Sequence, residues 1–436
     1  MRFKEFLDNF FLDFEFNLFL LGILFLPSAP SIACIFFIFP LIKGFLKIKN
    51  KILKDKFNLT LLIASAIMIL KTIFGYFQEP TIESWDPMLN LVGLANWIPL
   101  FICFWGFQPY LISSEKRLLI SKFFIASSIP VLFSGINQYF FKIFGPFKIF
   151  NGLIIWYQRP IDFIGGGGLT GVFNNQNYTG AWLTMIFPIC LGVFLINKKK
   201  NLNLKAFILL VISMFFVICS VLTNSRGAWI SILVSIPIVM GRLTLYWLLP
   251  LVVFLVSIII LTLIPNIPEQ LQNYLQIIIP KKVSIKFEEI LLNFRNYPRI
   301  HIWINAIFYI VNKPLFGWGA AAFPILYLES FGLRNNHAHN LFLELSINYG
   351  LISSILIFGA ILKILKSSYD FIFKEKTLLL INDRTWWAAS IIFLLSHMYD
   401  VLYYDLRISI SSWIFLSGLK VIIDKNSKIN NIHKNA

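Results

Sequence analysis

About a dozen apolar segments of membrane-spanning length constrain this chain more than any other feature. A bilayer core about 30 Å thick requires roughly 20 apolar residues per helix. The segments cover approximately residues 14–28, 30–46, 58–77, 88–108, 118–140, 178–196, 204–223, 228–241, 243–264, 340–362, 386–404 and 407–423. Lipid offers no partner for unpaired backbone groups, and the hydropathy is continuous rather than alternating, so the segments are predicted to be helices. We therefore expect an all-α, polytopic membrane protein with about 12 transmembrane helices.

The composition agrees with this class. Hydrophobic residues make up 58% of the chain and charged residues only 14%, which lies outside the range of soluble globular domains. The four cysteines fall within predicted spans without paired spacing, so neither a disulfide framework nor a zinc site is expected from them. The first, second and eighth segments are short and could be tilted, merged or re-entrant. Acidic residues precede the first apolar run, which disfavours a cleavable signal peptide.

The net charge of +17 could indicate nucleic-acid binding, but the basic residues are spread over the loops between spans. No nucleic-acid partner is therefore expected. If the N-terminus is cytoplasmic, most Lys and Arg residues fall in the tails and in alternate loops, including residues 43–56, 116–122, 198–205 and 363–384. This is the positive-inside pattern. It predicts one transmembrane domain over residues 1–436, with both ends inside and the polar motifs on the outer, periplasm-like face.

Two of the expected outer segments are long, at residues 141–177 and 265–338. Loops of this length in a compact protein usually carry function. The larger loop is predicted to contain short helices, because residues 268–279 and 300–311 show helical apolar spacing. No tandem repeat and no separate soluble domain are evident in the sequence.

The smaller loop ends in a stretch rich in glycine and amides, residues 169–177, which includes Thr170-Gly171-Val172-Phe173 and Asn177. Amide groups and exposed backbone suit sugar hydroxyls or phosphate oxygens. The preceding Gly165 to Gly168 could equally be a flexible turn.

Two arginines are candidates for binding an anion. Arg226 lies in a polar break between two apolar segments, where an arginine is costly unless it reaches water or an anion. Positive-inside topology disfavours an arginine on the outer face, so an anionic ligand is favoured over simple snorkelling. Arg299, with Trp303, precedes a Pro- and Gly-rich stretch at residues 313–319. A guanidinium matches phosphate geometry with paired donors. Arg295 and a structural ion pair remain alternatives for this position.

Two of the five histidines lie one residue apart in the motif His337-Ala-His339-Asn340, where the large loop meets an apolar segment. A neutral imidazole can accept a proton from a hydroxyl nucleophile. The pair could instead bind zinc, although no third ligand is visible close by in the sequence. His397, Asp400 and Asp405 are spare candidates for an acid or an orienting partner. The favoured interpretation places them at a helix end, because His397 and Asp400 are three apart on one helical face.

Metal-dependent glycosyl transfer normally uses an acidic pair such as Asp-x-Asp, and the sequence contains none. In a glycosyl transfer without a metal, cationic side chains would have to neutralise a diphosphate leaving group.

Together these motifs resemble the superfamily of O-antigen ligases and O-antigen polymerases of bacterial envelopes. The resemblance spans roughly residues 165–420 and rests on four ordered pieces: Thr170-Gly171-Val172-Phe173 with Asn177, Ser225-Arg226-Gly227, Arg299 with Trp303 leading into residues 314–319, and His339-Asn340. In ligases of this family a Gly-x-x-Gly follows the histidine motif. Here the corresponding residues are Gly350-Leu351-Ile352-Ser353, and the serine departs from strict ligase identity.

The resemblance implies a GT-C-like fold in the bacterial inner membrane, with residues 265–338 as a large periplasmic loop carrying catalytic elements. It implies a metal-independent, inverting transfer of a glycan from undecaprenyl diphosphate to an acceptor hydroxyl on the periplasmic face, with no cofactor. The acceptor would be lipid A-core or a growing glycan. His339 matches the proposed base, while Arg226 and Arg299 match arginines thought to bind the diphosphate. His337, Asn340 and Asn177 would contact substrate or support these groups.

Other functions compete with this interpretation. A polymerase extends the glycan rather than attaching it, and another relative glycosylates protein; the sequence does not separate these. A solute transporter of the bicarbonate type is less favoured, because a carrier needs ionisable groups near the bilayer midplane. An inactive envelope scaffold is a further alternative.

Overall fold

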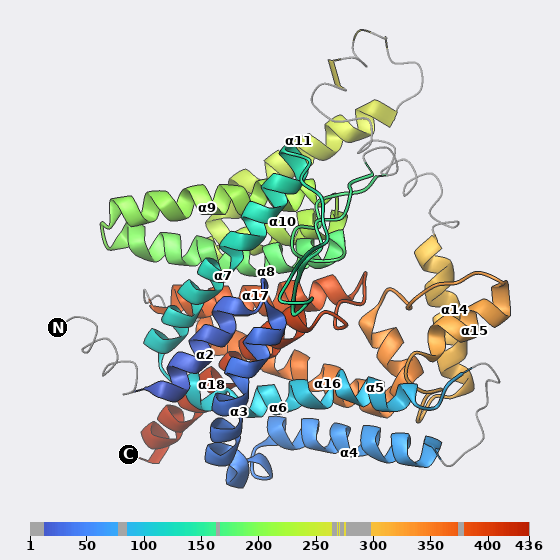
Figure 1. Cartoon of the computed structure of the whole chain (residues 1–436). Helices are drawn as coiled ribbons and strands as arrows, with labels where there is room; N and C mark the ends of the chain where they lie inside the picture. The colour runs from blue at the N-terminus through green and yellow to red at the C-terminus, as the bar shows by residue number, and fades with distance from the viewer. Residues whose placement is uncertain are drawn as a thin grey trace.

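The computed structural model describes residues 13–76, 85–162, 166–263, 268, 270, 274–275, 298–373 and 379–435. Gly165, Arg295 and most of the helix predicted at 268–279 lie outside these residues. The helices are α2 (Phe14–Phe25), α3 (Pro30–Ile52), α4 (Lys56–Tyr76), α5 (Leu89–Ala95), α6 (Ile98–Gly106), α7 (Ser114–Phe140), α8 (Gln176–Lys199), α9 (Asn203–Leu222), α10 (Arg226–Met240), α11 (Leu245–Leu263), α14 (Pro298–Asn312), α15 (Ala322–Phe331), α16 (Leu341–Ile372), α17 (Leu379–His397) and α18 (Leu406–Asn435). Two 3₁₀ turns, η1 (Gln108–Tyr110) and η2 (Arg242–Thr244), and two strands, β1 (Phe147–Ile149) and β2 (Ile154–Trp156), complete the elements (Figure 1).

Each of the twelve predicted segments overlaps a helix, so the mostly helical, polytopic prediction is confirmed. The number of spans differs from the prediction. Among the described residues, nine helical stretches are long and apolar enough to cross a membrane. With 12 and 15 residues, α2 and α10 are too short, and α17 is not among the nine. The segment predicted at 386–404 is displaced, because α17 ends at His397 and residues 398–405 form a turn.

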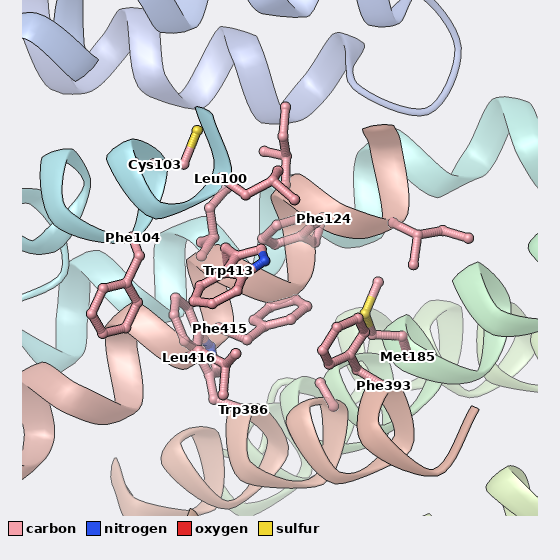
Figure 2. Packing of buried hydrophobic residues seen from close by; sticks show 14 of the residues in the cluster. Leu100, Cys103, Phe104, Phe124, Met185, Trp386, Phe393, Trp413, Phe415 and Leu416 are labelled. Atoms are coloured by element: carbon pink, nitrogen blue, oxygen red, sulfur yellow. The ribbon is translucent and has the colours of Figure 1, made fainter. Parts of the chain in front are cut away.

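The centre of the bundle is formed where α18 packs against α6, α7, α8 and α17 (Figure 2). The Trp413 ring on α18 meets the ring of Phe101 edge-on at 5.1 Å. Phe415, also on α18, contacts Phe124 of α7 at 4.8 Å and Trp386 of α17 at 5.3 Å between ring centroids. By contrast, α9 and α11 expose most of their apolar side chains, as lipid-facing helices do.

The two long segments expected on the outer face add two structures to this bundle. The helices α14 and α15 lie beside each other near the start of α16 (Figure 1), around a separate cluster that includes Tyr309, Phe323 and Tyr327. The helix predicted at residues 300–311 is therefore confirmed as α14. The second structure is an antiparallel hairpin of β1 and β2, which the sequence analysis did not predict. Trp156 Nε1 donates to Ser28 O at 2.9 Å and fastens the hairpin to the turn before α3.

A kink in α16 sets the direction of its first turns, and Gly350 causes it. Gly350 has φ +81°, a left-handed conformation that glycine adopts without strain. Residues 314–319 fit against the kink: Leu351 N–H donates to Pro314 O at 2.7 Å and Trp318 N–H to Ile347 O at 2.7 Å. A Cβ on Gly350 would lie 2.0 Å from Leu315 O. The Pro- and Gly-rich motif therefore has a structural role, which is to hold the part of α16 that follows His339-Asn340.

Candidate active site

The polar groups of the site converge on Asp400, in the turn between α17 and α18. Its side chain is buried. Oδ1 lies 3.2 Å from His339 Nδ1 and 3.6 Å from His337 Nε2, and it accepts a hydrogen bond from Val401 N–H at 2.9 Å. Oδ2 accepts a hydrogen bond of 2.8 Å from Asn177 Nδ2, at the start of α8. Three of the six predicted site residues thus meet on one carboxylate.

Local backbone structure directs the two imidazoles. Asn340 is the N-cap of α16, because its side chain accepts the Leu343 N–H at 3.2 Å, while its Nδ2 donates to Met398 O at 3.1 Å. This second bond holds the Asp400 turn against α16. His339 has φ +51°, and its N–H donates to His337 Nδ1 at 3.3 Å. With Nδ1 occupied in this way, His337 presents Nε2 to Asp400.

The charge on Asp400 fixes the proton arrangement of His339. Burial raises the pKa of Asp400, but the hydrogen bond from His339 and the charges of both histidines outweigh it and bring the pKa to about 2. Asp400 is then ionised at neutral pH and can only accept hydrogen bonds. His339 Nδ1 therefore carries the proton that faces Asp400, and its Nε2 keeps a free lone pair. An imidazole held by a carboxylate in this way is ready to act as a general base.

His337 is held in its neutral form. Burial, together with the charges of His339 and Arg299, outweighs the opposing effect of Asp400 and lowers the pKa of His337 to about 4. The residue is therefore uncharged at neutral pH and supports the orientation of its neighbours.

The two predicted arginines lie in the first turns of α10 and α14. Arg299 lies in the first turn of α14, and its charge acts on both His337 and Tyr399. Arg226 is the first residue of α10. The next residue, Gly227, packs against Tyr399 so closely that a Cβ would lie 1.8 Å from the ring carbon Cζ. Since Tyr399 precedes Asp400 in the chain, the start of α10 packs against the turn that carries Asp400.

The glycine- and amide-rich stretch before α8 has a largely structural role. The predicted substrate contacts of residues 169–177 are therefore restricted to fewer residues. Thr170 and the two residues Val172 and Phe173 are buried. Gln138 of α7 accepts the backbone N–H groups of Thr170 and Gly171 at 2.9 and 2.7 Å. The exposed backbone predicted to bind substrate is thus occupied by the protein itself, and Asn177 is the residue of this stretch that reaches Asp400.

Sequence reasoning treated Asp400 as secondary and did not consider Glu344 as a site residue, and the structure places both acidic residues at the centre. Asp400 was interpreted as a helix-end residue, whereas it lies outside α17 and joins three parts of the chain. Glu344, fully buried in the first turn of α16, accepts the Ala338 N–H at 2.9 Å and the Tyr404 hydroxyl at 3.3 Å. An acidic residue inside an apolar run was the available signal for both.

The same centre corrects the argument against a metal. His337, His339 and Asp400 each offer a ligand atom, and these atoms lie within 4.8 Å of one another. A third ligand is therefore present, and two nitrogens with one carboxylate oxygen form a donor set that suits zinc. Those same atoms form the hydrogen-bonded arrangement described above, so the fold accounts for them without an ion.

A known family model matches a stretch of the chain that contains part of this site. Residues 211–358 match the family model described as O-antigen ligase. The match supports the O-antigen ligase and polymerase superfamily. Such a family implies a ligase- or polymerase-type glycosyltransferase in a bacterial membrane, acting on a lipid-linked glycan and an acceptor. No curated protein matches the chain.

The O-antigen ligase match covers Arg226, Arg299 and the His337 to Asn340 motif. Asn177 and Asp400 lie outside it, one before and one after the matched segment. They reach the histidines only through the packing of α8, α16 and the turn before α18.

Proposed function

We propose that the protein transfers a glycan from undecaprenyl diphosphate to an acceptor hydroxyl on the periplasmic side of the inner membrane, with inversion and without a metal. The hydrogen bond between His339 Nδ1 and Asp400 carries this proposal. It leaves Nε2 of His339 as a proton acceptor at the end of the bundle where several helices begin.

In the proposed step the acceptor oxygen attacks the anomeric carbon of the donor glycan and gives its proton to His339 Nε2. The bond between that carbon and the diphosphate oxygen breaks at the same time, and the diphosphate leaves with the electron pair. General-base help of this kind contributes about 10² to 10⁴ in rate.

Arg299 and Arg226 are proposed to stabilise the charge that develops on the diphosphate. The start of α10 packs against Tyr399, and the charge of Arg299 acts on the same tyrosine; we therefore assign both cations to the diphosphate. Fixed cations near the leaving group supply electrostatic stabilisation without reorganisation during the reaction. The polyprenyl chain can remain in lipid, while the head group reaches the polar end of the bundle.

The general-base role is tested with purified protein in proteoliposomes that contain undecaprenyl-diphosphate glycan and acceptor. His339→Ala should lower the rate of transfer by at least about 100-fold. His301→Ala is a matched control, because His301 is exposed on α14 and contacts Tyr327 rather than Asp400. Undiminished transfer by His339→Ala, with normal expression, contradicts the assignment.

The arginine roles need a different measurement. Arg226→Lys and Arg299→Lys keep the charge but lose the paired donors of guanidinium. Both should bind polyprenyl diphosphate about tenfold more weakly, consistent with the loss of a charge-assisted hydrogen bond. Binding equal to that of the parent protein contradicts the bidentate role.

A polymerase of the same superfamily would use the same base and cations with a growing glycan as acceptor. The envelope glycans of a deletion strain separate the two. Loss of polymer from lipid A-core with accumulation of lipid-linked polymer indicates a ligase, whereas lipid A-core capped by single repeats indicates a polymerase. Solute flux without any glycan transfer would favour the transporter instead.

A further inference from the structure

A second polar pocket lies beside the Asp400 centre. It has a volume of about 480 Å³ and is bounded by the β1–β2 hairpin and by the starts of α3, α8 and α18. Its polar lining includes Tyr157, Asn174, Tyr178, Tyr404, Asp405 and Arg407. Neither the histidines nor Asp400 belong to its lining, so it is distinct from the centre described above.

Two connections make this pocket a neighbour of the base. Tyr178 lines the pocket and follows Asn177 on α8, whose side chain donates to Asp400 at 2.8 Å. On the other wall, the Tyr404 hydroxyl donates to Glu344 at 3.3 Å. Glu344 in turn accepts the N–H of Ala338, the residue between the two histidines. A ligand in the pocket would therefore lie next to the His339–Asp400 pair.

The pocket differs in charge from the side of Asp400 where the arginines begin. Arg407 forms a buried ion pair with Asp405, with Nη2 2.5 Å from Oδ2 and Nε 2.9 Å from Oδ1. Arg407 is held further by Val172 O at 3.3 Å and lies 3.9 Å from the centre of the Phe173 ring. A guanidinium neutralised and fixed in this way is poorly suited to a diphosphate, but its surroundings suit a neutral ligand.

The remaining lining suits a sugar. The rings of Tyr157, Tyr178 and Tyr404 provide flat faces whose electron-rich surface attracts the C–H groups of a pyranose. Asn174 Oδ1 is buried and has no hydrogen-bond partner among the described residues. A buried acceptor of this kind is costly when it is unpaired, and a ligand hydroxyl would satisfy it. The pocket volume also falls within the range of about 300 to 1,000 Å³ that small-molecule sites show.

We propose that this pocket binds the acceptor saccharide, and the proposal rests on the transferase function proposed above. The donor diphosphate enters on the side of His337 and Tyr399, where Arg299 acts. The acceptor sugar enters on the side of Asn177 and Tyr178, so that one hydroxyl reaches His339 Nε2 between them. This arrangement separates the nucleophile from the leaving group, as an inverting displacement requires.

Steady-state kinetics test the assignment with Tyr157→Ala and Asn174→Ala. Each variant should raise the KM for the acceptor about five- to tenfold, as expected for one lost hydrogen bond or ring contact. The KM for the donor should stay within about twofold, because the arginines are unchanged. Phe150→Ala is the matched control, since this residue lies on the same hairpin, is 72% exposed and does not line the pocket. An unchanged acceptor KM, or an increase in the donor KM instead, overturns the proposal.

A binding experiment separates this proposal from the transfer reaction. Lipid-free, dephosphorylated oligosaccharides of the host envelope are titrated into the detergent-solubilised parent, without donor, and followed by saturation-transfer NMR. Binding that Tyr157→Ala and Asn174→Ala weaken, and Phe150→Ala does not, supports the pocket even if the parent transfers no glycan. Binding that is absent in the parent, or equal in all four proteins, overturns it. Equal melting temperatures exclude misfolding as the cause of weakened binding.

Discussion

His339 and Asp400 lie 61 residues apart in the chain, yet His339 Nδ1 is 3.2 Å from Asp400 Oδ1. The contact joins the capped start of α16 to the turn that precedes α18. Because Asp400 also accepts the side chain of Asn177, the three long helices α8, α16 and α18 begin around one carboxylate. The histidine that the sequence indicates as a base therefore has an orienting partner, Asp400, which the sequence offered only as a spare candidate.

Replacing this carboxylate should remove the orientation without removing the base. We expect Asp400→Asn to lower kcat by about 10² to 10⁴, because an amide no longer holds the proton on Nδ1 of His339. The KM for the lipid-linked donor should change little. Initial rates in proteoliposomes measure both constants. Asp370→Asn, an exposed carboxylate at the far end of α16, serves as the control. Rates within threefold of the parent would disprove the role of Asp400.

Asn177 should matter through the same carboxylate. Asn177→Ala removes the 2.8 Å hydrogen bond to Oδ2 of Asp400 and should reduce kcat about five- to tenfold. Asn177→Asp should be more harmful at neutral pH, because it places a second carboxylate at hydrogen-bond distance from an ionised one. Comparing kcat of the two variants at one pH checks the order. A more active Asp variant would show that charge at this position is unimportant.

Gly227 is predicted to act by leaving room for Tyr399. A Cβ at this position would lie 1.8 Å from Cζ of the Tyr399 ring, so Gly227→Ala must displace that ring. Overpacking of this kind typically costs about 1 to 3 kcal/mol. We expect a lower melting temperature for Gly227→Ala alone, and no further decrease when Gly227→Ala is added to Tyr399→Ala. If the decreases in melting temperature of the two single variants add up in the double variant, Gly227→Ala does not act through Tyr399.

The position of the helices followed from the sequence because long apolar runs in lipid have few alternatives to a helix. Their ends followed less well. The apolar run that includes Leu394, Leu395 and Leu402 continues past His397, and hydropathy therefore extended the eleventh segment to residue 404. Asp400 leaves the helix because its hydrogen bonds come from α8 and from the residue before the α16 cap. Contacts between residues so far apart in the chain produce no periodic pattern in the local sequence, so the end of α17 could not be predicted from it.

The β1–β2 hairpin shows a local signal that was overlooked. Asn151-Gly152 lies between two apolar, β-branched stretches, and this dipeptide is a strong hairpin indicator. Residues 141–177 were interpreted as a functional loop because of their length, and the hairpin within them was not predicted. In the stretch that follows, the amide-rich motif indicated a ligand, but Gln138 of α7 already satisfies its backbone. Composition identified this stretch as a candidate functional segment. Only the packing showed that most of it has a structural role.

The metal-independent mechanism gives a direct prediction for chelation. His337, His339 and Asp400 could together ligate a divalent ion. Chelation therefore distinguishes a metal site from a hydrogen-bonded general base formed by the same residues. If His339 acts as a base with Asp400 as its partner, dialysis of the protein against EDTA should leave kcat unchanged. Metal analysis before and after dialysis accompanies the rate measurement. A loss of at least tenfold that zinc restores would replace the proposed mechanism with a metal-assisted one.

The pH dependence of stability should report the burial of His337. Its pKa is about 4 in the folded protein and ordinarily 6.5, so between these values the unfolded chain binds a proton that the folded chain does not. The contribution of neutral His337 is therefore present above pH 6.5 and is lost as the pH falls toward 4, with a full shift corresponding to about 3 kcal/mol. Asp400 titrates near pH 2 and stays charged throughout this window.

Melting temperatures of the parent and of His337→Gln, measured in detergent from pH 4 to 7.5, isolate this contribution. All other titrating groups are common to both proteins, so the difference between the two curves belongs to His337 and the residues it touches. The parent should lose more stability than His337→Gln between pH 6.5 and 4, and the curves should run parallel above pH 7. Parallel curves over the whole range would mean that the pKa of His337 is the same in the folded and unfolded protein, so that His337 takes up a proton below about pH 6.5 in the fold as well. Asp400 would then hold a charged imidazole beside His339, and the neutral support assigned to His337 would be wrong.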